Sequence, residues 1–178
     1  MSLDAVRLRP VLEPDLEMFD RFALDPELSG EFEWHGWHDP GALRREWAQN
    51  GLLGGDGGRL MVVRDDERLG FVGWRKFLVV RESFCWNIGI RLLPEARGHG
   101  VGTRAQRLLV RYLFLHSQVM RIEADTEAEN HAEQRALEKA GFTREGVIRA
   151  GAFRGGRWRD GVVYSILRTE VDLDSPEP

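Results

Sequence analysis

The segment RGHGVG, residues 97–102, places three glycines between an apolar, strand-like run that ends at Leu92 and Leu93 and a helical pattern over 103–115. Glycine lets the backbone adopt positive φ and approach a ligand closely, and the start of a helix offers free N–H groups and a favourable dipole. Together these features predict a site for an anion, most simply a phosphate. The alternative interpretation is a glycine-rich turn that binds nothing.

Two familiar phosphate loops fit this segment poorly. A Walker A loop requires a lysine and then Ser or Thr after its last glycine, but Gly102 is followed by Thr103 and Arg104. A dinucleotide fingerprint requires a third glycine where Thr103 stands, and it follows its strand directly, whereas the sequence PEAR intervenes here. Glu123 and Asp125 at the next strand keep the dinucleotide hypothesis open.

The glycine loop needs a strand before it and a helix after it, and the neighbouring sequence predicts both. The stretch 58–80 indicates two strands around the polar turn DDERLG, and 84–93 indicates a third strand that pairs with them as a meander. A short strand over 120–126 returns past a helix, so we expect it to lie parallel to a neighbour. The glycines therefore lie inside a βαβ unit.

The rest of the chain predicts further strands and helices in one domain. They are a first strand over 5–11, helices over 13–24, 40–49 and 132–142, and a closing pair of strands over 147–153 and 161–168. This order predicts an α+β fold with a mixed sheet. We expect a single domain over 1–170 and a flexible acidic tail over 171–178.

Composition excludes several classes of function. The formal net charge of −4 over 178 residues argues against a nucleic-acid partner, which normally requires a basic excess. No run approaches the roughly 18 apolar residues of a membrane span, and the first residues lack the core of a secretory signal. We therefore expect a cytoplasmic protein without a membrane partner. Cys85 is the only cysteine and the five histidines lack metal-ligand spacing, so we predict no disulfide and no metal.

A family resemblance joins these features. The segment RLLPEARGHGVGT resembles the acyl-CoA pyrophosphate loop of the GNAT N-acetyltransferase superfamily, whose pattern of Arg or Gln, two residues, Gly, any residue, then Gly or Ala is filled by Arg97, Gly100 and Gly102. The segment AENHAEQRALEKAGFTREG is similar to the family's next strand end and helix, with Asn130 at the cofactor asparagine. The ending over 150–170 resembles the branch that acetylates ribosomal-protein N-termini, with its small-molecule relatives.

The resemblance implies a GNAT-like fold and a cofactor site. The fold is a mixed, mostly antiparallel, twisted sheet flanked by helices, with central strands that splay apart, and the cofactor is acetyl-CoA. Backbone N–H groups of the loop would hold the pyrophosphate, with Asn130 on the pantetheine arm and the preceding strand beside it. The implied cofactor residues are Ile90, Leu92, Arg97, Gly98, His99, Gly100, Val101, Gly102, Thr103 and Asn130.

The resemblance also implies direct attack of an amine on the thioester, which requires a group to bind the carbonyl and a base. A backbone N–H where the strand splays, near Gly89 and Ile90, would bind the carbonyl oxygen. Some relatives carry the base on the strand before the loop, but residues 84–87 include no carboxylate here. The remaining candidates are Glu133, His35, His38 and Asp160.

The proton donor to the leaving thiolate departs from the family pattern as well. Many relatives place a tyrosine four residues before the Gly-Phe pair, where this chain has Leu137. The ribosomal branch often uses a serine three residues after the asparagine, and Glu133 stands there. Glu133 and, as an alternative, Tyr164 are therefore the candidate donors, although a thiol with a pKa near 8.5 leaves with little help.

Two aromatic loops are candidates for the acceptor site. Phe32, Trp34, His35 and Trp37 lie in one loop and Trp158 in the other, where they either line a cleft or cap the core. We expect an N-acetyltransferase that modifies a primary amine, either a protein N-terminus or a small-molecule amine. The alternative is a non-catalytic coenzyme A-binding module on the same fold. An edge strand near the C-terminus makes a homodimer possible.

Overall fold

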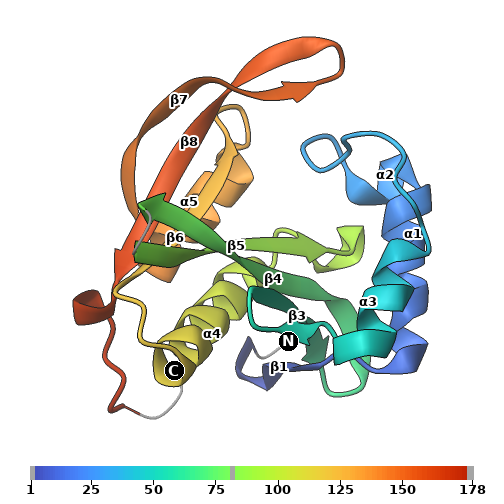
Figure 1. Ribbon diagram of the computed structural model, residues 1–178, viewed down its shortest axis with the longest axis horizontal. Helices are drawn as coiled ribbons and strands as arrows, with labels where there is room; N and C mark the ends of the chain where they lie inside the picture. The colour runs from blue at the N-terminus through green and yellow to red at the C-terminus, as the bar shows by residue number, and fades with distance from the viewer. Residues whose placement is uncertain (1–2, 81–82, 176–178) are drawn as a thin grey trace.

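The computed structural model describes residues 3–80 and 83–175 and contains one sheet of eight strands (Figure 1). The strands follow the order β1-β3-β4-β5-β6-β8-β7, with β2 beside β3. They are β1 (Val6–Pro10), β2 (Leu53–Gly54), β3 (Gly57–Arg64), β4 (Glu67–Val80), β5 (Ser83–Leu92), β6 (Arg121–Glu127), β7 (Thr143–Arg154) and β8 (Arg157–Leu167). Among the described strands only β5 and β6 pair in parallel. The predicted meander, βαβ unit and closing pair are confirmed.

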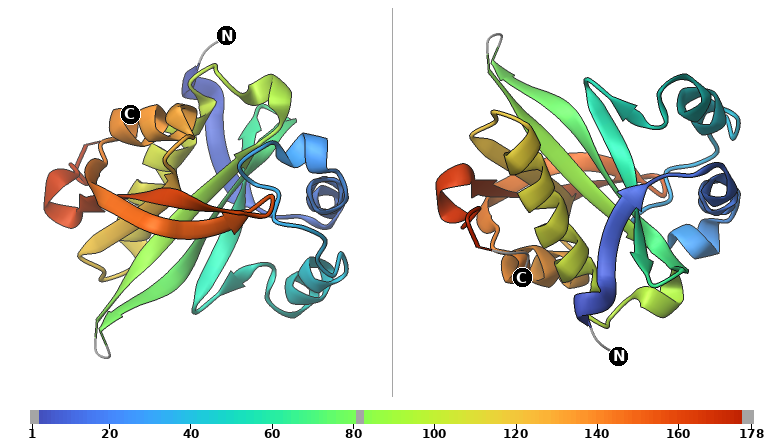
Figure 2. Two further views of the ribbon diagram at one scale, coloured as in Figure 1. Left: turned by 90° about the horizontal axis from the view of Figure 1, so that it is seen from above. Right: turned by 90° about the horizontal axis from the view of Figure 1, so that it is seen from below.

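Five α-helices cover the two faces of this sheet. They are α1 (Leu16–Leu24), α2 (Pro26–Ser29), α3 (Ala42–Asn50), α4 (Val101–His116) and α5 (His131–Ala140), with short 3-10 turns at Leu3–Ala5, Glu13–Asp15, Pro94–Ala96 and Arg168–Glu170. Helices α4 and α5 lie together on one side of the sheet, and α1, α2 and α3 gather on the other (Figures 1 and 2). None of the described helices is long and apolar enough to cross a membrane.

Strand β3 shows why the sheet needs helices on both faces. Its residues 60–63 are all apolar and buried, which is typical of a strand covered on both sides. Because successive side chains point to opposite faces, Leu60 and Val62 join the cluster under α4, whereas Met61 and Val63 join the cluster under α1.

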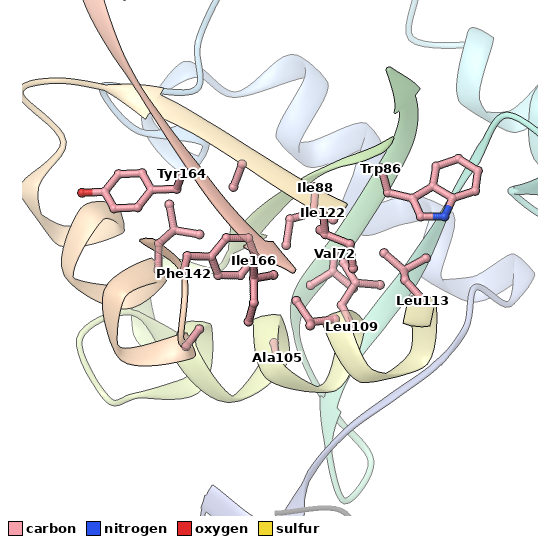
Figure 3. Packing of buried hydrophobic residues seen from close by; sticks show 14 of the residues in the cluster. Val72, Trp86, Ile88, Ala105, Leu109, Leu113, Ile122, Phe142, Tyr164 and Ile166 are labelled. Carbon is pink, nitrogen blue, oxygen red and sulfur yellow. The ribbon is translucent and has the colours of Figure 1, made fainter. Parts of the chain in front are cut away.

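Helix α4 provides much of the larger core (Figure 3). Ala105, Leu109 and Leu113 repeat every four residues and are buried against the sheet. They pack with Val72, Ile88 and Ile122 of the central strands, among others. This packing fixes the beginning of α4, and with it the glycine loop, against the end of β5.

The central strands separate at what we call the fork. Strands β5 and β6 pair only over Trp86–Ile88 and Ile122–Ala124. Beyond that point β5 remains paired with β4 as far as Leu92, and β6 remains paired with β8 as far as Glu127. The prediction of splayed central strands near Gly89 is confirmed.

Some element boundaries differ from the sequence prediction. Helix α4 begins at Val101 rather than at 103, because Gly100 adopts the left-handed conformation and serves as its N-cap. Helix α3 covers Ala42–Asn50 rather than 40–49. The turn between β7 and β8 consists only of Gly155 and Gly156, which both have positive φ.

The acidic tail is packed where it leaves the domain. Val171 and Leu173 are partly buried against the larger core, and the Arg111 guanidinium donates to the Asp172 carbonyl at 3.1 Å. These contacts hold the start of the tail against the domain, whereas the sequence predicts flexibility over 171–178. Residues 176–178 lie outside the described residues.

A buried carboxylate fixes the position of α1, which forms one wall of the cavity described below. Asp15 is 1% exposed and accepts two hydrogen bonds from Arg9, at 2.5 and 3.0 Å, and one from the Leu12 N–H at 2.8 Å. It also forms an ion pair with Arg68, whose Nε lies 3.0 Å from the Asp15 Oδ1. Burial acts to raise the pKa of Asp15, but the Arg9 and Leu12 hydrogen bonds and the two arginine charges outweigh it and lower the pKa. The carboxylate thus joins β1, β4 and the start of α1.

We expect Asp15→Asn to lower the free energy of unfolding by about 2–4 kcal/mol at pH 7, because two arginines then face a neutral buried amide. Since the folded chain lowers the pKa of Asp15, this stabilisation is present above the ordinary carboxyl pKa of about 3.9 and is lost as the pH falls through the folded-state pKa. The difference from wild type should therefore shrink below about pH 4. Urea unfolding at several pH values measures it.

Asp20→Asn is the matched control on the same helix. Asp20 pairs with Arg44 at the surface, where both side chains are partly exposed, so we expect a change below about 1 kcal/mol. Equal losses in the two variants would contradict the structural role of Asp15.

Candidate active site

The loop before α4 has the geometry of an anion site. Gly98 and Gly100 have φ of +76° and +80°, a conformation that favours glycine. No side chain caps the helix at Gly100, and the first backbone bond of α4 runs from the Arg104 N–H to the Gly100 carbonyl. The N–H groups of the first turn therefore have no partner within the helix and remain available, together with the helix dipole, to a pyrophosphate.

Arg97 supports the loop through its side chain. Its guanidinium donates to the Leu92 carbonyl at 2.9 Å and to the Leu28 carbonyl at 2.7 Å. These bonds join the end of β5 to α2, so they fix the position of the loop. Gly102 lies over the strand, since a Cβ there would meet the Leu92 and Ile90 side chains at 3.7 and 4.0 Å, in ordinary contact. His99 is exposed. The predicted loop residues thus lie together, and they fit an acyl-CoA pyrophosphate.

Asn130 and Glu133 lie at the start of α5, beside α4. The Asn130 Oδ1 accepts from the Glu133 N–H at 3.2 Å, and its Nδ2 donates to the Thr126 hydroxyl at 3.0 Å. Asn130 is therefore a helix N-cap that also joins α5 to the end of β6. The Thr103 hydroxyl donates to the Ala136 carbonyl at 3.4 Å and joins α4 to α5. The contact of Asn130 to pantetheine stays a prediction.

Glu133 has an unusual environment. It is half-buried between the two helices, where the Gln106 amide donates to it. Burial raises the pKa of Glu133 to about 7; the Gln106 hydrogen bond opposes this effect and the charge of Glu33 adds to it. A carboxyl group with this pKa carries a proton in part of the population at neutral pH, so it can donate one.

The structure does not bring Tyr164 to this site. The side chain is fully buried, and its hydroxyl contacts Glu138 Oε1 at 3.1 Å and Gln134 Oε1 at 3.5 Å. Figure 3 shows this hydroxyl pointing away from the central strands, toward α5. Burial and Glu138 together raise the pKa of Tyr164. The environment is that of a core tyrosine with a hydrogen-bonded hydroxyl.

A cavity of about 1260 Å³ lies on the other face of the fork. Helices α1 and α3, the loop before α3, strands β3 and β4, both arms of the fork and part of the β7–β8 hairpin line it. Ile90, Gly89 and Ile88 contribute one arm, beside the point where β5 loses its partner. An unpaired strand edge that faces a cavity is a suitable place for an N–H that binds a carbonyl oxygen.

The predicted acceptor residues divide between the cavity and the surface. Phe32, Trp34 and His35 line the cavity. Trp37 is 69% exposed and lies outside the lining, with its ring edge-on to Trp34 at 4.8 Å between centroids. Trp158 is 67% exposed and packs against Phe153 on the outside of the hairpin. The hairpin reaches the aromatic loop instead through Arg154, whose guanidinium lies 5.4 Å from the Phe32 ring centre.

Two other candidate bases have different positions. His38 lines the cavity, and its Nδ1 lies 2.8 Å from the Gly36 carbonyl. Asp160 is not in the lining, and it accepts from the Ala150 N–H at 2.8 Å, where Ala150 has a φ of +51°. Asp160 therefore stabilises an irregular turn of β7 rather than facing the cavity.

The structure adds two residues to the site that the sequence analysis did not place there. The Asn87 amide on β5 donates to the Asp125 carboxylate on β6 at 2.8 Å, and both residues line the cavity at the fork. The sequence points to Asp125 only through the dinucleotide fingerprint. The signal that identifies it is its place on the strand, since Ala124 and Ile122 are buried under α4 and α5 and alternation turns Asp125 to the cavity.

Comparison with known proteins agrees with this geometry. Residues 5–143 match the model of the acetyltransferase (GNAT) domain. The probable N-acetyltransferase YjcK of Bacillus subtilis is 35% identical over 112 residues, which span 62% of this chain and 61% of that relative.

Two solved structures show the same fold. Spermidine N-acetyltransferase from Vibrio cholerae, in complex with CoA and spermine, superposes with a TM-score of 0.80 at 18% identity, over 94% of this chain and 98% of that one. RimJ of Mycobacterium smegmatis, in complex with CoA-disulfide, gives 0.73 at 24% identity, over 93% and 83%. The predicted acyltransferase class and its acetyl-CoA cofactor are confirmed, and the chain belongs to the GNAT acetyltransferase family.

Proposed function

We propose that this protein transfers an acetyl group from acetyl-CoA to a primary amine, of a protein N-terminus or a small molecule, by direct attack within a ternary complex. The observation that carries the proposal is the fork. It has the anion-binding loop at the end of one arm, and a large cavity opens on the opposite face of the sheet. A thioester that passes through the fork would meet an amine from the cavity. Among the similar proteins, one acts on spermidine, a small amine.

The chain's own residues would hold the donor at three places. The N–H groups of the loop from Arg97 to Thr103 would bind the pyrophosphate, and the side chains of Ile90 and Leu92 lie beneath Gly102. Asn130 has a second amide hydrogen for a pantetheine carbonyl, because its Nδ2 makes one bond, to the Thr126 hydroxyl, among the described residues. When bound, acetyl-CoA supplies an activated acyl group and a thiolate leaving group.

Glu133 would then protonate the sulfur as it leaves. The residue lies on the helix side of the fork, near the loop that holds the phosphates, and it does not line the acceptor cavity. Its raised pKa, at about 7, leaves a proton available at neutral pH. This position supports a role as acid rather than as base. Carboxyl groups that can donate or accept a proton lie at the fork. Their presence supports catalytic activity over the alternative of a non-catalytic coenzyme A-binding module.

The extent of the domain and its assembly are also part of the proposal. We infer that residues 1–170 act as one acyl-CoA-dependent domain, since the described strands β1 to β8 share one sheet. Strand β7 lies at an edge of that sheet. The predicted homodimer would form there, either by pairing of edge strands or by packing of one sheet face on another.

The direct test is amine-dependent release of coenzyme A thiol from acetyl-CoA. The acceptors are two sets, short peptides with free N-termini and small primary amines. Release that depends on one set, above the acceptor-free rate, would establish the transfer and identify the acceptor class. Binding of acetyl-CoA without release from either set would support the non-catalytic module instead.

Gly100→Ala should weaken acetyl-CoA binding about tenfold or more, measured by isothermal titration calorimetry. Alanine disfavours the φ of +80°, which strains the backbone of the loop, and its Cβ would lie 3.0 Å from the Leu3 side chain, which must move away. Gly102→Ala is the matched variant, because a Cβ there meets only ordinary contacts at 3.7 Å or more. We expect it to change the affinity less than threefold. A larger loss at Gly102 than at Gly100 would contradict this account of the loop.

Glu133→Gln should lower kcat about 100-fold at pH 7 with acetyl-CoA affinity nearly unchanged, because glutamine keeps the shape of the side chain and cannot donate a carboxyl proton. In wild type the protonated form of Glu133 is lost as the pH rises through about 7, so kcat should carry a descending limb there. The variant should lack this limb. Steady-state thiol release from pH 5.5 to 9 measures both effects.

Glu138→Gln is the control on the same helix. It removes the same charge, but its carboxylate contacts Tyr164 away from the fork. We expect kcat and its pH profile to match wild type. A loss as large as that of Glu133→Gln would return Tyr164 and Glu138 to consideration as the proton donor pair.

A further inference from the structure

The carboxylates that line the acceptor cavity are paired with cations at all positions but one, within the described part of the chain. The paired carboxylates and their partners are Asp20 with Arg44, Glu33 with Arg91, Asp39 with Arg45, Glu46 with Arg59, Asp56 with Lys76, and Glu127 with Arg154. Asp125 is the exception, because its one hydrogen-bond partner among the described residues is the neutral amide of Asn87, at 2.8 Å. The charge of Asp125 is therefore the one that a cationic ligand can neutralise.

Asp125 also lies at the point where chemistry is expected. It is the first residue of β6 beyond the parallel pairing with β5, and Ile88 and Gly89 of the facing arm line the same cavity. The side chain is exposed to the cavity rather than covered by the helices. An ammonium group bound by this carboxylate would lie beside the unpaired edge of β5, where the carbonyl of the acyl group is to be held.

Asn87 fixes the carboxylate in this position. Arg75 donates from Nε to the Asn87 Oδ1 at 3.2 Å, which determines the orientation of the amide and directs its Nδ2 to Asp125. Asp125 has two oxygens with about four lone-pair sites, and the bond from Asn87 occupies one of them. The remaining sites face the cavity, so they are available to the hydrogens of an ammonium group.

We propose that Asp125, oriented by Asn87, binds the ammonium group of the acceptor and accepts its proton as the nitrogen attacks the acyl carbon. The inference rests on the proposed N-acetyltransferase function and adds a base to it. It also defines the acceptor chemically as an amine that enters the cavity as a cation. Glu127, next to it on the fork, is held by two bonds from Arg154 and does not compete for the ligand.

The proton and electron balance is simple. The ammonium must lose two protons to become the amide. The Asp125 carboxylate takes the first, directly or through one water, and passes it to solvent, and the freed lone pair forms the C–N bond. The C–S bond breaks with its electron pair on sulfur, and Glu133 supplies the proton that yields the thiol. The second proton becomes strongly acidic once the C–N bond has formed, and water carries it from the nitrogen to the Glu133 carboxylate. No other reactant is required.

The first test compares Asp125→Asn with wild type, using the best amine from the acceptor screen. We expect kcat/KM for the amine to fall at least 100-fold, with the dissociation constant of acetyl-CoA unchanged within twofold. Glu123→Gln is the control, since it removes the same charge two residues earlier on the same strand. Glu123 pairs with Arg121, which keeps Glu145 as a second partner, so this variant should retain the wild-type kcat/KM.

The double variant Asn87→Asp with Asp125→Asn moves the carboxylate across the fork and reverses the hydrogen bond. It should recover less than threefold of the activity that Asp125→Asn loses, because the moved carboxylate pairs with the Arg75 guanidinium. A merely structural role for Asp125, which the restored hydrogen bond would satisfy, predicts recovery instead. If wild type acetylates the amine and Asp125→Asn does so within threefold, the inference is wrong and the proposed function stands. A wild type without amine-dependent thiol release would overturn both.

Discussion

The structure depends on one interruption in backbone pairing, the fork between β5 and β6. Parallel pairing lasts for three residues on each strand and then stops in the middle of the sheet, not at its edge. Unpaired N–H and C=O groups inside a domain are costly unless another partner satisfies them. The neighbouring pairs hold the fork open, because β4 and β8 keep the two arms straight through Leu92 and Glu127. A ligand with amide groups of its own, such as pantetheine, is a suitable partner for such an edge.

The two faces of the fork provide unlike electrostatic environments. On the helix side Glu133 is half-buried beside the amide of Gln106, and burial raises its pKa to about 7. On the cavity side Asp125 is exposed and holds a single bond from an amide. Two carboxyl groups in environments this different can divide acid and base roles between them without exchanging protons. The two groups come from different elements, Asp125 from β6 and Glu133 from α5, so the division follows from alternation along β6 and the placement of α5 rather than from a long-range network.

The sequence predicts features that depend on neighbouring residues, and it does not predict contacts between residues far apart in the chain. The glycine loop, the N-cap at Asn130 and the βαβ order depend on residues within a few positions, and all three appear in the structure. The contact between Asn87 and Asp125 spans 38 residues and depends on strand register, which no local pattern determines. Tyr164 shows the opposite error. Its residue type makes it a candidate proton donor, but strand register directs its hydroxyl to Glu138. Trp37 and Trp158 were grouped with the cavity by composition alone, and they lie outside its lining.

The arginines explain how a cavity rich in carboxylates can still select for one charge. A ring of unpaired acids would attract any polycation and would repel the phosphates held nearby. Among the described residues, each carboxylate of the cavity lining but one is matched by Arg or Lys. Arg91 with Glu33 ties the aromatic loop to the sheet, and Arg154 with Glu127 joins the β7–β8 hairpin to the end of β6. Within the described lining, Asp125 and Arg75 are the two charges that bond the Asn87 amide instead of an opposite charge, and both lie at the fork. Selectivity then follows from position, because the Asp125 carboxylate lies where the nitrogen must be for transfer.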